Sequence, residues 1–146
     1  NVDCFGNATG SIDITVAGGT APYTYLWNTS ATTEDLTDLA LGIYTLTVTD
    51  TLNCTEVIVI EVTEPAAPLE VTLLVTDVSC FGDSTGAIDA TVTGGTFPYT
   101  YLWSNGYTTQ NLYNIPTGSY SVIVTDSNGC QNTAYAFISE PSLLII

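Results

Sequence analysis

Residues 18–27 read Gly-Gly-Thr-Ala-Pro-Tyr-Thr-Tyr-Leu-Trp, and residues 94–103 read Gly-Gly-Thr-Phe-Pro-Tyr-Thr-Tyr-Leu-Trp. The two stretches differ at one aligned position, which is Ala21 in the first and Phe97 in the second. In each, a pair of glycines marks the end of one strand, and the tyrosines and the tryptophan then alternate with smaller or polar residues, as in a β-strand with one buried face. The same turn and strand are therefore predicted twice.

The repetition extends over the whole chain. Aligning each residue with the one 76 positions later gives 30 identities in 70 pairs, and these include all four cysteines and two Glu-Pro pairs. Such self-similarity is typical of tandem modules. We divide the chain into a first repeat at residues 1–68, a second at residues 69–142 and a tail at residues 143–146.

The two repeats differ at their starts. An apolar, β-prone run at residues 69–78 precedes Cys80, whereas only three residues precede Cys4, so the first repeat is expected to lack most of its first strand. The tail, Leu-Leu-Ile-Ile, is an aggregation hazard unless another strand pairs with it. It is interpreted either as the start of a further repeat or as a strand donated to a neighbouring chain.

Period-two alternation predicts an all-β fold. Ile12, Ile14 and Val16 alternate with polar residues, and no segment keeps a helical period. We expect tandem immunoglobulin-like β-sandwich modules, each of about 75 residues with one disulfide. Trp27 and Trp103 would lie on the third strand of each module, where such sandwiches bury a tryptophan.

Two further tyrosines support this fold. Leu-Gly-Ile-Tyr at residues 41–44 and Thr-Gly-Ser-Tyr at residues 117–120 are similar to a tyrosine corner, in which the phenol donates a hydrogen bond to upstream backbone.

Composition excludes several functions. The 146 residues include 15 acidic side chains and no lysine, arginine or histidine, for a net charge of −15. Nucleic acid and anionic membranes are therefore excluded as partners, no apolar run is long enough to insert into a membrane, and no ordinary general base is present. One carboxylate group, Glu34 with Asp35 or Asp38, is replaced by amides in the second repeat, so we predict no enzyme.

The four cysteines predict disulfides. In a sandwich of this topology the chain start and the turn after Asp50 are expected at the same end, so we predict the pairs Cys4–Cys54 and Cys80–Cys130. Bonded pairs indicate an oxidising, extracellular setting. Two cysteines 50 residues apart without histidine match no zinc spacing.

Taken together, these motifs resemble the SprB repeat. They are Cys-Phe-Gly-x-x-x-Gly-x-Ile, Val-x-Gly-Gly-Thr-x-Pro-Tyr-x-Tyr-x-Trp, Gly-x-Tyr-x-x-x-Val-Thr-Asp, a cysteine and Glu-Pro. The resemblance implies a large surface protein of Bacteroidota, exported by type IX secretion. It implies an extracellular adhesive filament or stalk at the cell surface, acting in attachment and gliding motility, and brings no catalytic residues.

Two function classes remain. In the first, proline-rich linkers join the repeats into a semi-rigid stalk, whose partners are neighbouring repeats and surface glycans. In the second, the chain is a soluble ligand- or carbohydrate-binding module of a secreted enzyme. Tyr107 and Tyr113, both confined to the second repeat, are then the candidate sugar contacts, because aromatic rings stack on sugars.

Two candidate sites remain. Asp50 and Asp126, expected near Asp3 and near Asp77 or Asp83, carry oxygen ligands that suit calcium, the one cofactor considered; the alternative is a turn in which the aspartate caps backbone amides. Thr51 and Ser84 lie in Asp-Thr-Leu and Asp-Ser-Thr, which resemble the O-glycosylation motif of exported Bacteroidota proteins.

Overall fold

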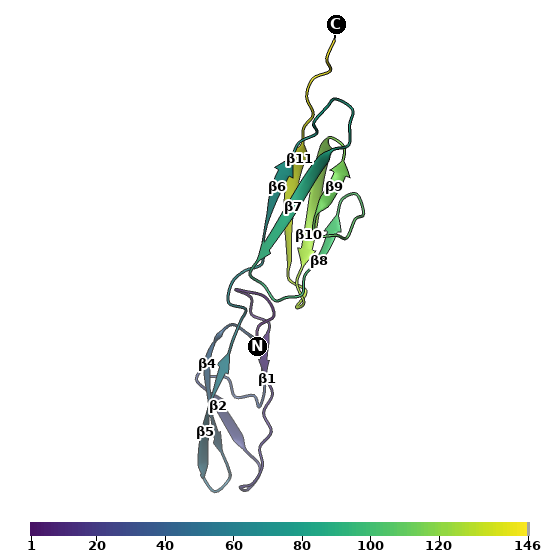
Figure 1. Cartoon of the computed structure of the whole chain (residues 1–146). Coiled ribbons are helices and arrows are strands. Elements are labelled where there is room, and N and C mark those ends of the chain that lie inside the picture. The colour runs from purple at the N-terminus through teal and green to yellow at the C-terminus, as the bar shows by residue number, and fades with distance from the viewer. Residues whose placement is uncertain (146) are drawn as a thin grey trace. The chain divides into compact units, whose positions relative to one another are not determined.

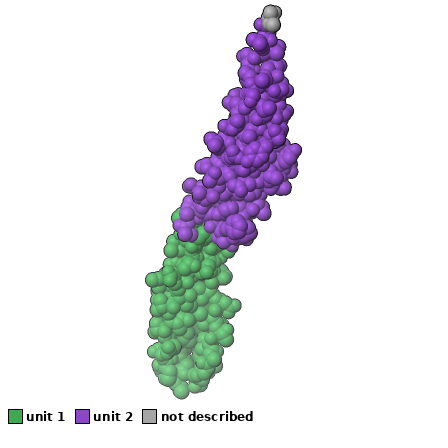
Figure 2. All heavy atoms as spheres, viewed as in Figure 1, with its two compact units in different colours: residues 1–65 green, residues 66–146 purple. Residues whose placement is uncertain are grey.

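The computed structural model describes residues 1–145, which form eleven β-strands and no helix. They group into two compact units, residues 1–65 and residues 66–146 (Figure 2). Within the described residues no helix is long and apolar enough to cross a membrane.

The second unit contains two antiparallel sheets of three strands (Figure 1). The first has the order β6-β7-β9, formed by Glu70–Thr76, Gly86–Thr93 and Leu112–Ile115. The second has the order β11-β10-β8, formed by Gln131–Ile138, Gly118–Thr125 and Thr100–Trp103. One sheet thus takes the first, second and fourth strands and the other takes the rest, like strands A, B, E and C, F, G of an immunoglobulin domain. The predicted all-β, immunoglobulin-like fold is confirmed.

The first unit has the same strand order with one strand fewer. One sheet pairs β1 (Gly10–Ile12) with β3 (Leu36–Leu39). The other has the order β2-β4-β5, formed by Thr24–Trp27, Gly42–Thr49 and Thr55–Val62. Within residues 1–65 no strand stands where β6 stands in the second unit.

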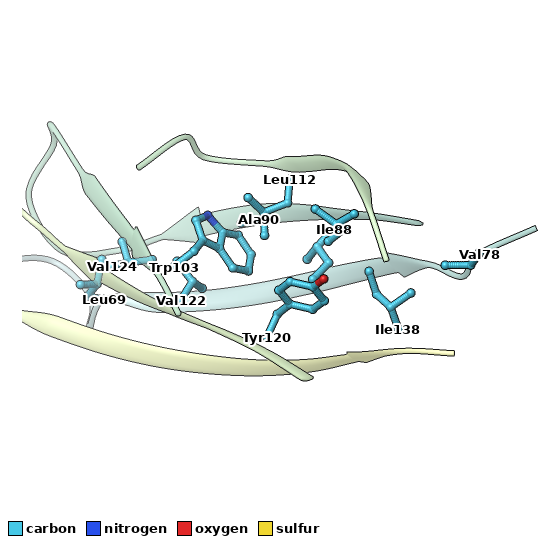
Figure 3. Close-up of a cluster of buried hydrophobic side chains, with 11 residues drawn as sticks. Leu69, Val78, Ile88, Ala90, Trp103, Leu112, Tyr120, Val122, Val124 and Ile138 are labelled. Carbon is cyan, nitrogen blue, oxygen red and sulfur yellow. The ribbon is translucent and has the colours of Figure 1, made fainter. Parts of the chain in front are cut away.

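The core of the second unit lies between its sheets (Figure 3). Trp103 is 1% exposed, and Val122 and Val124 of β10 are fully buried together with Ile88 of β7. Because side chains alternate between the two faces of a strand, every second residue of β10 faces the core. The Trp103 indole donates a 2.8 Å hydrogen bond to the carbonyl of Thr109, which satisfies its one polar group.

Both predicted tyrosine corners are present. The Tyr120 hydroxyl donates a 2.9 Å hydrogen bond to the carbonyl of Pro116, and the Tyr44 hydroxyl donates one of 3.0 Å to that of Ala40. Each phenol thereby joins the start of a long central strand to the preceding turn.

The first unit has an open groove where the second has β6. In the second unit β7 pairs with β6 from Ala87 to Thr93. The equivalent strand β1 pairs only with β3 and ends at Ile12, so the predicted strand residues Ile14 and Val16 lie beyond it. A groove of about 380 Å³ runs along residues 14–19 and is floored by side chains such as Leu46 and Ile58.

The tail forms no strand over residues 139–145, and Leu143, Leu144 and Ile145 are exposed. Ile146, the last residue of the predicted tail, lies outside the described residues. The role of the tail stays a prediction.

Candidate functional site

Most of the predicted site residues lie in two kinds of loop. The Cys-Phe-Gly loop comprises residues 4–9 in the first unit and residues 80–85 in the second. The Asp–Cys loop comprises residues 50–54 in the first unit and residues 126–130 in the second. Each kind of loop has the same internal hydrogen bonds in both units.

A buried carboxylate organises the Asp–Cys loop. Asp126 is 5% exposed, and its Oδ1 accepts 2.9 Å hydrogen bonds from the backbone N–H groups of Asn128 and Cys130. Its Oδ2 accepts a third, of 2.9 Å, from the N–H of Thr96. Since three amides converge on one side chain, the aspartate ties its own loop to the Gly-Gly-Thr turn.

Asp50 repeats this arrangement in the first unit. It accepts from the N–H groups of Leu52 and Cys54 at 2.9 Å and of Thr20 at 3.1 Å. These bonds favour the ionised form and hold the pKa of Asp50 below its ordinary value of 3.8, the Cys54 amide being the largest cause.

These hydrogen bonds match the turn-capping alternative. The expected proximity of Asp77 to Asp126 is wrong, because Asp77 accepts a hydrogen bond from the N–H of Ser139, past the end of β11, whereas Asp126 lies before its start. Within residues 1–145 no group of three acidic, histidine or cysteine side chains could hold a metal ion. Calcium at Asp50 or Asp126 alone stays a prediction.

The Cys-Phe-Gly loop is held by a glutamate. In the second unit the Gly82 N–H donates a 2.8 Å hydrogen bond to Oε2 of Glu140, and the Asp83 N–H donates one of 3.1 Å to the carbonyl of Cys80. In the first unit Gly6 donates to Glu64 at 2.7 Å. The sequence showed Glu-Pro as a shared motif, but nothing in its spacing indicated that this glutamate binds a loop 58 residues away.

The predicted pairs Cys4–Cys54 and Cys80–Cys130 are wrong. Cys130 immediately precedes β11, whereas the loop of Cys80 lies past the other end of that strand, where Val78 donates to the carbonyl of Ser139. Eight strand residues separate the two ends. At about 3.3 Å per residue this is about 26 Å, far beyond the roughly 7 Å that a disulfide allows between Cα atoms.

The first unit has the same geometry. Cys54 immediately precedes β5, and the Val2 N–H, two residues before Cys4, donates to the carbonyl of Thr63 past the other end of that strand. The expectation that both cysteines of a repeat lie at one end was therefore the error.

The bonding state of the cysteines differs between the units. Cys4 and Cys130 are disulfide-bonded, whereas Cys54 and Cys80 are free and exposed. The bonded cysteine lies in the Cys-Phe-Gly loop of the first unit and in the Asp–Cys loop of the second, so the prediction of two bonded cysteines in each repeat is wrong.

The two tyrosines proposed as sugar contacts lie in different elements. Tyr107 is in the loop after β8 and is 58% exposed. Tyr113 is not in a loop but in β9, where it is 59% exposed and its hydroxyl donates a 2.7 Å hydrogen bond to Oδ1 of Asp89. This hydrogen bond is the largest cause that raises the pKa of Tyr113.

Sequence reasoning missed another exposed pair of aromatic rings. Tyr135 and Phe137 point outward from β11 and are 80% and 63% exposed. The alternation of side chains along β11 indicates that these two rings face outward, since Ala134 and Ala136 pack against the core on the other face of the strand.

Of the two glycosylation candidates, Thr51 is exposed and its hydroxyl donates a 3.0 Å hydrogen bond to the carbonyl of Thr20. Ser84 is exposed in the Cys-Phe-Gly loop. Both assignments stay predictions.

The solved structure of an amphioxus IgVJ-C2 molecule is 12% identical and has a TM-score of 0.41 over 90% of this chain and 96% of that one. A TM-score this low supports no argument about fold or function. No curated protein sequence matches the chain.

The family model described as the SprB repeat matches residues 1–32 and residues 72–108. One match falls in each unit, and each contains the cysteine of a Cys-Phe-Gly loop and the tryptophan of a repeat. Each repeat therefore contains a stretch that is similar to the SprB repeat.

Proposed function

We propose that this chain is a repeat segment of a large extracellular adhesin or filament, acting as a semi-rigid stalk in attachment and in gliding motility. The observation that carries the proposal is that one all-β module occurs twice in tandem with a SprB match in each copy. Because each copy buries its own core, copies joined in series lengthen the chain without depending on one another to fold.

The stalk proposal agrees with the chemistry of the surface. A net charge of −15 opposes nonspecific association between neighbouring chains. The one carboxylate group considered for catalysis is engaged in structure, because Glu34 accepts a hydrogen bond from the Tyr25 hydroxyl and Asp35 accepts one from the Ile14 N–H. We therefore assign the chain no enzymatic role.

Neighbouring copies of the repeat are the proposed partners. The groove along residues 14–19 supports pairing by strand donation, because β6 occupies the equivalent position in the second unit. Surface glycans are a further proposed partner.

Immunogold electron microscopy of source cells tests the proposal. An antibody raised against this chain is expected to label thin fibres projecting from the envelope, and antibody preabsorbed with the purified chain is the control. Label confined to secreted globular particles would overturn the filament and favour an accessory module.

The accessory-module alternative has its own support in the exposed rings of Tyr107 and Tyr113. If it holds, the intact chain binds a glycan on an array and the double variant Y107A/Y113A loses that binding. The variant Y135A, which removes an exposed ring from β11, is the matched control.

A further inference from the structure

We propose that the free cysteines form disulfide bonds with another copy of the repeat. Cys54 would bond to the cysteine of a Cys-Phe-Gly loop, and Cys80 to the cysteine of an Asp–Cys loop. Between two chains of this sequence the proposal specifies a bond from Cys54 of one to Cys80 of the other. This goes beyond a stalk whose copies are joined by the backbone alone, because it crosslinks copies through their side chains.

Equivalent cysteines of the two repeats differ in their bonding state. The alignment at a spacing of 76 residues makes Cys80 the equivalent of Cys4, and Cys54 the equivalent of Cys130. Cys4 and Cys130 are disulfide-bonded, whereas their equivalents are free. Each kind of loop therefore holds a bonded cysteine in one copy, so both kinds are suited to bonding.

The loop around the cysteine has the same backbone conformation whether the cysteine is bonded or free. Around Cys54 and Cys130 the aspartate four residues earlier accepts from the cysteine N–H at 2.9 Å in both units. Asn53 and Gly129, the residues before these cysteines, both have positive φ angles, of 63° and 85°. The free thiol is thus presented as its bonded equivalent is.

The Cys-Phe-Gly loops agree equally well. The carbonyls of Cys4 and Cys80 each accept a 3.1 Å hydrogen bond from the backbone N–H three residues later. The glycines two residues after the cysteines have φ angles of 76° and 79°. No rearrangement of the loop is needed for Cys80 to bond as Cys4 does.

The two cysteines of one copy lie too far apart to bond to each other. The two kinds of loop lie beyond opposite ends of an eight-residue strand in each unit, so a cysteine cannot reach the other cysteine of its own copy. Exposed thiols at the two ends are instead available to other copies. Bonding between unlike ends leaves one reactive thiol at each end of the product, so it propagates from copy to copy as head-to-tail contacts do.

The bond needs an oxidant, for which we specify a small disulfide such as oxidised glutathione. The Cys54 thiolate attacks one glutathione sulfur and displaces the first glutathione thiolate. The Cys80 thiolate of the other copy then attacks the Cys54 sulfur and displaces the second. The two cysteine protons end on the two released glutathiones, and the two electrons lost by the cysteines reduce the glutathione disulfide.

The test incubates the intact chain with oxidised and reduced glutathione and separates the products on a non-reducing gel. The wild-type chain is expected to form a ladder of covalent multimers, with the Cys54–Cys80 crosslink identified by mass spectrometry. The variants C54A and C80A are each expected to remain monomers. Their mixture is expected to form a dimer and nothing longer, because each supplies one of the two thiols.

Three results would overturn the proposal. They are a wild-type chain without multimers, a single variant that dimerises through like cysteines as fast as the mixture does, and a monomer that has bonded its own Cys54 to its own Cys80. The double variant C54A/C80A, which keeps Cys4 and Cys130, is the control for exchange at the bonded cysteines.

A second experiment determines whether the bonded copies belong to one polypeptide or to two. In a polypeptide that joins two copies of this sequence end to end, a bond between the halves that leaves a monomer indicates copies within one chain. A ladder indicates copies on separate chains, and the absence of both overturns the proposal. The failure of this bond would leave the filament proposal untouched, because that proposal is tested on cells.

Discussion

Single side chains hold the loops at both ends of each unit. Asp50 and Asp126 collect three backbone amides each, and Glu64 and Glu140 bind the amides of the glycines in the Cys-Phe-Gly loops. An amide left without a partner in a partly buried loop costs about 1–3 kcal/mol. Acidic side chains therefore hold the loops of the free and of the bonded cysteines alike.

We predict that replacing Gly129 by alanine lowers the stability of the second unit through backbone strain alone. Its φ is 85°, and a Cβ there would meet no atom within 4 Å, so G129A should destabilise the second unit by about 1 kcal/mol through left-handed strain. Urea unfolding followed by Trp103 fluorescence in a W27F background measures the change.

The control for Gly129 comes from the first unit. Asn53 occupies the equivalent position with a φ of 63°, so G129N should cost clearly less than G129A. Equal losses for the two variants would contradict the assignment of the cost to backbone strain.

At Asp50 we predict a loss of stability in acid. Its pKa is lowered in the folded state, chiefly by the Cys54 amide, so its contribution is present above the unfolded pKa near 3.8 and is lost as the pH falls through the folded pKa. Unfolding free energies measured between pH 6 and about pH 2 should fall less steeply in D50N. An unchanged slope in D50N would refute the prediction.

At the scale of elements, nearly the same sequence forms strands of different length. Residues 10–17 and residues 86–93 share five of eight residues, yet β1 has three residues and β7 has eight. The difference lies in the partner, since β6 pairs with β7 from end to end and β1 has no such neighbour. Backbone groups without a ladder partner do not extend a strand.

Supplying that partner should stabilise the first unit. We predict that joining the sequence of residues 69–76 ahead of Asn1 extends β1 and fills the groove floored by Leu46 and Ile58. Burying a few aliphatic side chains should add about 2 kcal/mol or more to the stability of the unit. Thermal unfolding followed by Trp27 fluorescence in a W103F background measures the gain.

A polar version of the same extension is the matched control. Replacing the residues that correspond to Leu69, Val71 and Leu73 by threonine keeps the added length and backbone but removes most of the apolar area. An equal gain with both extensions would show that the groove does not bind the apolar face of a strand.

At the scale of the whole molecule, charge of one sign dominates. With a net charge of −15 and no cationic side chain, carboxylates repel one another without compensation. At low ionic strength this repulsion destabilises the compact state, and about 0.1 M salt reduces its range to roughly 10 Å.

We therefore predict that the melting temperature rises as sodium chloride is increased from about 10 mM to about 0.5 M. Most of the rise is expected below about 0.1 M, because the screening length shortens there from about 30 Å to about 10 Å. A melting temperature that does not change with salt would contradict the prediction.

Calcium and magnesium chloride at equal millimolar concentrations separate screening from binding. The calcium prediction at Asp50 and Asp126 requires a larger rise with calcium than with magnesium. Equal melting temperatures in the two salts would overturn it, because two divalent ions screen alike.

The sequence by itself determined the repeat, the all-β class and the tyrosine corners. Trp103, Tyr120 and Val122 could be assigned to the core because a strand exposes alternate side chains to opposite faces, which is a local rule. The same rule predicts that the rings of Tyr135 and Phe137 face outward, as they do, although the sequence analysis did not identify them.

Only the tertiary structure decided which ends of the strands come together. The separation of Cys80 from Cys130, the hydrogen bond from Gly82 to Glu140 and the end of β1 at Ile12 all depend on pairing between distant segments. Local pattern indicates that a residue lies on a strand and which face it takes. It does not indicate the end of the sandwich to which the next turn returns, because the strand order determines this, and the strand order is set by non-local packing.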